Sequence, residues 1–164
     1  MGFLSWYEMQ LAWLETTPIA NAIRTTPWMY PTFESLHYVG LAFLVGGIML
    51  IDLRTLGLAR SLQLRSMIGL LPWVWAGFLI NVTTGSLLFI YGATSFGLRW
   101  PFLMKMGFMV MAGLNALAFD LSTKRFGGTW VDEDKPPVPV KVFATLSLAL
   151  WLCVVTFGRW MAYV

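Results

Sequence analysis

His37 is the only histidine of the 164-residue chain, and it lies in a largely apolar stretch. A helix that begins near Pro31 would carry the imidazole about 9 Å along its axis, at 1.5 Å per residue. At that depth in a membrane, an ionisable residue is either a ligand or proton relay, or an interhelical hydrogen-bonding group. Glu34 and Gly40 lie one turn before and one turn after it, on the same helix face.

Later hydrophobic segments place further polar groups at a similar depth. Lys105 lies one turn inside the third segment, Arg159 lies near the end of the fourth, and Gly85 follows Thr84 in the second. Two cations near a histidine suit haem b, because the imidazole binds the iron and the cations pair with the propionates. Alternatively, both cations simply extend to the lipid headgroups.

Glycine beside an inward-facing histidine would let a flat ligand approach the helix backbone. Small residues also let two helices pack closely, so this alternative stays open. The candidate cofactor-binding residues are His37, Lys105, Arg159, Gly40, Gly85 and Glu34.

Methionines are concentrated in the third segment, at positions 104, 106, 109 and 111. Thioethers bind Cu(I), which makes copper the alternative cofactor. Neighbouring methionines here point to different helix faces, however, which is more typical of side chains that fill packing gaps. Met106 or Met109 could also be a sixth ligand of a haem iron, since the chain has no second histidine. The candidate metal ligands are therefore His37, Met106 and Met109.

Other polar residues indicate structure rather than chemistry. Cys153 is the only cysteine, which excludes an intramolecular disulfide and a c-type haem attachment motif. Asp52 and Arg54 are expected to pair at the end of the first segment. Interhelical hydrogen bonding is expected of Asn81, Thr83, Thr84 and Asn115. No nucleophile–base pair, phosphate-binding loop or zinc constellation is present.

Composition identifies the setting of these residues. Hydrophobic residues make up 58% of the chain and charged residues 12%, whereas soluble domains carry about 25% charge. Four apolar segments each reach the roughly 20 residues that a bilayer requires. We predict an all-α, four-helix transmembrane bundle over residues 30–164, with helices at about 31–58, 67–91, 101–123 and 138–163.

Residues 1–29 are predicted to form an amphipathic segment at the membrane interface. The stretch from Met1 to Leu14 is too short and too polar to span, and Thr17 with Pro18 is a typical start of a second short helix. A cleavable signal peptide is not expected, because the first fifteen residues contain Glu8 and Glu15 and no cation.

The distribution of cations predicts the orientation. Seven of the eleven Lys and Arg residues fall on the side of the first and third connections: Arg54, Arg60, Arg65, Lys124, Arg125, Lys135 and Lys141. The other four are Arg24, Arg99, Lys105 and Arg159. The positive-inside rule therefore predicts that both termini are periplasmic. Nucleic-acid binding is not expected, since no basic run is interleaved with exposed aromatics.

Short motifs resemble known membrane proteins over roughly residues 31–125. The segment Glu34-Ser35-Leu36-His37-Tyr38-Val39-Gly40, continuing to Gly47, resembles the first helix of HemJ-type protoporphyrinogen oxidases. Thr84-Gly85, and then Trp100 to Lys105, resemble their later pattern, and CopD-type copper-resistance proteins share a similar Thr-Gly…Lys arrangement. Small uncharacterised bacterial inner-membrane proteins carry the Asp52-Leu53-Arg54-…-Leu56-Gly57 signature.

The resemblance to HemJ-type proteins implies haem b bound through His37 and a functional role for Lys105. The N-terminal extension and the fourth helix depart from that pattern, so the resemblance does not decide whether the haem-synthesis activity is retained. We expect a b-type haem protein of the bacterial inner membrane that acts in electron transfer or membrane redox chemistry. The alternatives are a CopD-like copper-handling protein and a non-catalytic partner subunit. Expected partners are the lipid bilayer, a redox partner and further copies of the chain.

Overall fold

The computed structural model describes residues 2–58, 60–125, 129–131, 133 and 135–163, and this part of the chain contains helices and no strand. Two short helices come first: α1 (Phe3–Glu15) and α2 (Pro18–Thr25). The remaining elements are α3 (Met29–Thr55), α4 (Leu64–Ile68), α5 (Leu71–Tyr91), α6 (Ala93–Gly97), α7 (Trp100–Arg125), the 3-10 helix η1 (Thr129–Val131) and α8 (Val138–Trp160).

Four helical stretches are long and apolar enough to cross a membrane: Met29–Thr55, Leu64–Tyr91, Trp100–Ser122 and Val138–Trp160. Their outward faces expose large apolar side chains such as Leu79, Val110 and Leu152, as a lipid-facing surface should. The predicted all-α bundle of four spanning helices is confirmed.

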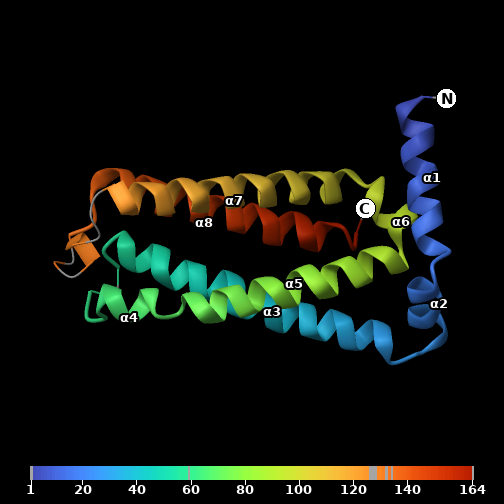
Figure 1. Ribbon diagram of the computed structural model, residues 1–164, viewed down its shortest axis with the longest axis horizontal. Coiled ribbons are helices and arrows are strands. Elements are labelled where there is room, and N and C mark those ends of the chain that lie inside the picture. Colours follow the sequence, from blue (N-terminus) through green and yellow to red (C-terminus); the bar gives the residue numbers. More distant parts are fainter. Residues whose placement is uncertain (1, 59, 126–128, 132, 134, 164) are drawn as a thin grey trace.

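The bundle consists of two antiparallel hairpins, α3 with α5 and α7 with α8 (Figure 1). The hairpins meet mainly where α3 packs on α8. Within the part of the chain that is described, α5 and α7 have little contact with each other. The side of the bundle between α5 and α7 is therefore less tightly closed than the side between α3 and α8.

Glycines make the contact between α3 and α5 close. A Cβ atom on Gly77 would lie 2.6 Å from the backbone nitrogen of Leu44 and 2.7 Å from the carbonyl oxygen of Gly40. A Cβ atom on Gly47 would lie 2.5 Å from a methyl group of Val74. Small residues at such crossings let two backbones approach within van der Waals distance.

Helices α1 and α2 lie across one end of the spanning helices (Figure 1). The Oε1 atom of Glu15 accepts hydrogen bonds from the backbone N–H (2.7 Å) and the hydroxyl (2.6 Å) of Thr94, and Oε2 lies 2.9 Å from Arg24. Trp6 and Trp13 are 54% and 61% exposed. Exposed indole rings across the end of a bundle suit the headgroup region, where such rings are enriched.

Helix bounds differ from the prediction at several ends. α3 begins at Met29 and ends at Thr55 rather than at position 58, because Gly57 adopts a left-handed conformation (φ 95°) and the N–H of Leu58 donates to the carbonyl of Leu53 at 3.0 Å. The second span is interrupted after Ile68, so α5 begins at Leu71 with Pro72 in its first turn. α8 ends at Trp160, not at position 163.

Candidate functional site

His37 is half-buried on α3 and faces α5. Its Nδ1 atom lies 2.9 Å from the Oγ1 atom of Thr84, and that hydroxyl also donates to the carbonyl oxygen of Ile80 at 2.7 Å. A hydroxyl has a single proton to donate. Both contacts are hydrogen bonds together only if the His37 Nδ1–H donates to Thr84.

This arrangement fixes the tautomer of the neutral imidazole. With the proton on Nδ1, Nε2 carries an available lone pair, which is the form that binds a metal. In metal sites the second ring nitrogen of a ligating histidine commonly donates to a neighbouring acceptor, which orients the ring and raises its basicity. Thr84 supplies such an acceptor to His37.

Gly85 allows the imidazole to lie against α5. A Cβ atom at this position would be 3.2 Å from Cε1 and 3.7 Å from Nδ1 of His37. The first distance is too short for ordinary van der Waals contact, so a larger residue would displace the ring. Gly85 therefore belongs to the immediate surroundings of His37.

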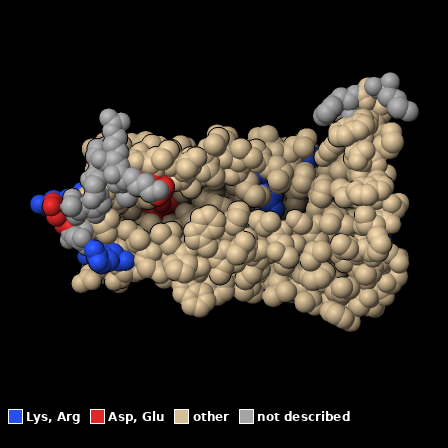
Figure 2. All heavy atoms as spheres, viewed as in Figure 1, with Lys and Arg blue, Asp and Glu red and all other residues tan. Residues whose placement is uncertain are grey.

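Lys105 approaches the same region from the other hairpin. Its Cδ, Cε and Nζ atoms would lie 3.6–3.7 Å from a Cβ atom on Gly158, so the side chain lies along α8. Its ammonium group lies close enough to contribute to the electrostatic environment of the His37 imidazole. A furrow runs between the two hairpins, with Lys or Arg atoms inside it (Figure 2). The fold thus brings Lys105 near His37 from the other hairpin.

Other predicted cofactor-binding residues lie elsewhere. Arg159 is exposed near the end of α8, where it donates to the hydroxyl of Tyr163 at 2.6 Å and stacks over that ring at 5.1 Å. Gly40 is buried beneath α5, and a Cβ atom there would lie 2.5 Å from Nδ2 of Asn81. Of the two explanations for Gly40, the structure therefore shows close helix packing. Glu34 is half-buried on α3.

The methionines of α7 are spread around the helix. Met106 is 41% exposed and Met109 is half-buried, while Met104 and Met111 are 42% and 50% exposed. Among the residues described, no group of three or more His, Cys, Asp or Glu side chains could hold a metal ion. A metal at His37 would therefore take its other ligands from thioethers, lysine, water or a cofactor.

The expected structural roles of the polar residues are partly met. Asn115 donates to the carbonyl of Phe143 on α8 at 3.0 Å, and Thr84 joins α5 to α3, which confirms interhelical bonding for both. Asn81 instead donates within its own helix, to Gly77 at 3.0 Å. Thr83 is exposed. The sequence predicted an interhelical hydrogen bond for Thr84 but not its effect on the histidine tautomer, which the adjacent Gly85 could have signalled.

Among the described residues, no ion pair joins Asp52 to Arg54. The prediction that these two side chains pair with each other was therefore wrong. The Nε atom of Arg54 donates to the carbonyl of Leu62, while Asp52 is buried within the bundle. Residues two positions apart on a helix are rotated by about 200° around its axis. Asp52 and Arg54 therefore point to nearly opposite sides of α3.

Comparison of the chain with known protein families, with curated proteins and with solved structures gave no match. The resemblance to HemJ-type and CopD-type proteins therefore stays a prediction.

Proposed function

We propose that this chain is a b-type haem protein of the bacterial inner membrane that acts in electron transfer or membrane redox chemistry. His37 would hold the iron of the haem through Nε2. The observation that carries the proposal is the hydrogen bond between His37 and Thr84. Since the Thr84 proton is donated to Ile80, the bond leaves Nε2 free for a metal.

The residues around His37 fit haem better than a bare ion. A porphyrin supplies four nitrogen ligands, so one protein histidine is enough to hold the iron. Copper or zinc alone would require further protein ligands in the same place. Lys105 adds a positive charge near the histidine, which suits a ligand that carries carboxylates.

Bound haem would supply one-electron chemistry, and the protein would supply orientation and environment. Thr84 would orient the imidazole and strengthen it as a ligand, and Gly85 would leave the space in which the ring lies. Lys105 would favour the anionic edge of the cofactor. Arg159 lies at the same end of the bundle as the termini, and its bond to Tyr163 makes it the weaker candidate for a propionate partner.

We further propose that the termini are periplasmic. Arg54 and Arg60 line one crevice together with Lys135 and Lys141, so the cations of the first and third connections gather at one end of the bundle. An excess of cations is typical of the cytoplasmic side. His37 and Lys105 then belong to the periplasmic half.

The test is the visible spectrum of the protein, purified in mild detergent from cells supplied with haem precursor. We expect a Soret band in the wild-type protein and in Tyr38→Ala, and its loss in His37→Ala. Tyr38 is the matched control, because it adjoins His37 in sequence and is exposed. Size-exclusion chromatography of each variant reports whether the bundle is intact.

Metal analysis of the same samples separates the alternatives. Stoichiometric copper without haem would overturn the proposal in favour of copper handling. A colourless, metal-free protein that co-purifies with another membrane protein would do so in favour of a partner subunit. A Soret band that is unchanged in an intact His37→Ala protein would show that the haem ligand lies elsewhere.

A further inference from the structure

A basic crevice of about 380 Å³ lies at the end of the bundle opposite α1 and α2. Four cations line it: Arg54 from the last turn of α3, Arg60 from the connection to α4, Lys135 from the connection before α8, and Lys141 from the first turn of α8. No Asp or Glu appears among its described lining residues. Its volume falls within the range of small-molecule sites.

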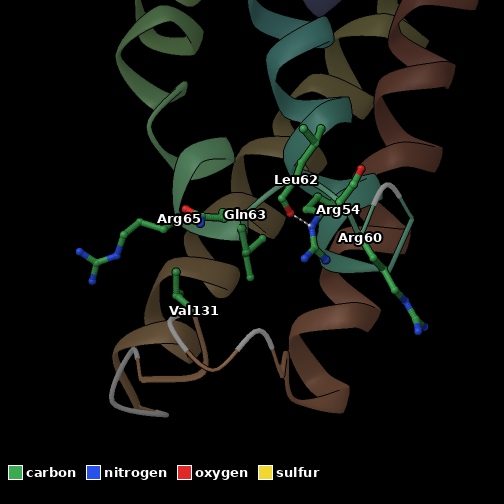
Figure 3. Close-up of a pocket in the computed structure, with 8 residues that line it drawn as sticks. Arg54, Arg60, Leu62, Gln63, Arg65 and Val131 are labelled. Atoms are coloured by element: carbon green, nitrogen blue, oxygen red, sulfur yellow. Dashed lines mark hydrogen bonds between the residues drawn. The ribbon is translucent and has the colours of Figure 1, made fainter.

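Two of these cations are held in place by the backbone. Arg54 is only 3% exposed, and its Nε atom donates to the carbonyl of Leu62 (Figure 3). Arg60 donates from Nε to the carbonyl of Gly57 at 3.0 Å. A guanidinium that is oriented in advance loses less conformational entropy when it binds an anion.

The end of α3 explains how this arrangement arises. Gly57 adopts its left-handed conformation in the motif that ends the helix, and its carbonyl then accepts from Arg60. The Asp52-Leu53-Arg54-…-Leu56-Gly57 signature thus builds both the helix end and one wall of the crevice. The first turn of α8, which contributes Lys141 to the lining, adds the positive end of a helix dipole.

A second pocket of about 300 Å³ adjoins the crevice and shares Arg54 and Arg60 with it. Arg65 also lines this pocket, but Figure 3 shows its side chain extending away from Arg54, on the side opposite to Arg60. Arg65 is not among the residues that line the basic crevice. It is therefore a nearby cation that lies outside the site.

We propose that the basic crevice binds a phosphate group carried by an anionic lipid headgroup. Guanidinium groups pair with phosphate oxygens through two parallel hydrogen bonds, and lysines add point charges. The crevice lies where α3 ends and α8 begins, at the level at which headgroups meet a spanning helix. This inference does not depend on haem binding.

The experiment measures lipid binding by the purified full-length protein with native mass spectrometry. Phosphatidylglycerol is the anionic probe, phosphatidylcholine is the control lipid, and inorganic phosphate is added in a separate arm. The test variant is Arg60→Gln with Lys141→Gln, and the matched control is Arg65→Gln. Arg60→Lys with Lys141→Arg keeps both charges and reports on the need for a particular geometry.

We expect phosphatidylglycerol to bind in preference to phosphatidylcholine, and the double variant to weaken this binding roughly 25-fold, about fivefold per charge. Arg65→Gln should change it by less than about twofold, because Arg65 does not line the basic crevice. The charge-retaining variant should lie between wild type and the double variant. Inorganic phosphate should compete only weakly with the lipid. Tight binding of inorganic phosphate, with no preference between the two lipids, would overturn the lipid assignment and would indicate a site for a soluble phosphate ligand.

A weakening of about fivefold by Arg65→Gln, the full effect of one charge, would overturn the proposal, since it would show attraction to the whole basic surface. Absence of binding by both phosphatidylglycerol and phosphate would also overturn it. Circular dichroism and size-exclusion chromatography establish that each variant retains its helices and its size.

Discussion

The Nδ1 atom of His37 lies 2.9 Å from the Oγ1 atom of Thr84, across the contact between α3 and α5. Because the same hydroxyl donates to Ile80, it can only accept from the imidazole. One threonine thus joins the two helices of a hairpin and fixes which nitrogen of the histidine is free. Structural and chemical roles coincide in this side chain.

Replacing Thr84 by Val keeps its shape and removes the acceptor. We expect the affinity for haem to fall about 10- to 100-fold, as it does when the hydrogen-bond partner of a ligating histidine is lost. Thr84→Ser should keep most of the affinity, since it keeps the hydroxyl. Haem titration of the apoprotein, followed at the Soret band, measures both; equal affinities for Val and wild type would contradict the assigned tautomer.

Two glycines that contact candidate ligands should respond differently to alanine. The Cβ atom of Gly85→Ala would lie 3.2 Å from the His37 ring, whereas that of Gly158→Ala would lie no closer than 3.6 Å to Lys105. We expect Gly85→Ala to displace the imidazole and change the haem spectrum, and Gly158→Ala to leave the spectrum unchanged. A changed spectrum in Gly158→Ala alone would reverse this ranking.

The crossing of α3 and α5 should be sensitive to side-chain volume at Gly77. Its added Cβ atom would meet backbone atoms of α3 at 2.6–2.7 Å, and backbone atoms cannot rotate away. We expect Gly77→Ala to lower the free energy of unfolding by about 1–3 kcal/mol. Gly107→Ala on α7 has nothing within 4 Å of its Cβ atom and should be neutral or slightly stabilising. Thermal unfolding in detergent measures both, and equal midpoints would contradict the close crossing.

The attachment of α1 should depend on pH. Hydrogen bonds from Thr94, and then the nearby Arg24, hold the pKa of Glu15 below its ordinary value. A carboxyl whose pKa is lowered by folding stabilises the folded state above its ordinary pKa, and the effect is lost as pH falls through its folded pKa. Limited proteolysis of the N-terminal segment should therefore accelerate as the pH falls below the ordinary carboxyl pKa of 4.5.

Glu15→Gln should remove most of this pH dependence, because glutamine does not titrate. Glu8→Gln is the matched control, since Glu8 is exposed on the same helix and should leave the pH dependence intact. An unchanged pH profile in Glu15→Gln would show that another group controls the attachment of α1.

Sequence alone was enough to establish the four spanning helices and most of their bounds. Apolar runs of sufficient length have few alternatives in a bilayer, because every backbone polar group must be satisfied within the segment. Pro72 and Pro101 correctly marked first turns, and Thr17 with Pro18 correctly marked the start of α2. The early end of α3 was missed, because leucines recur as far as Leu58 while the left-handed conformation of Gly57 ends the helix.

The central residue of the candidate site could also be found from the sequence, since a lone intramembrane histidine is conspicuous. The residues that surround this histidine could not be found in this way. Periodicity places Glu34, His37 and Gly40 on one face of α3, but it cannot say that α5 fills the space beside Gly40 and leaves Gly85 beside the imidazole.

Tertiary structure alone decided the tautomer of His37, the approach of Lys105 from the second hairpin, and the gathering of four cations in one crevice. Each depends on how helices distant in sequence cross and rotate against one another. Helix rotation and crossing are set by the packing of small and large side chains between helices, which a hydrophobic pattern along one chain does not encode. The sequence determined that there is a membrane bundle with one histidine inside it, and the packing determined which nitrogen of that histidine is free.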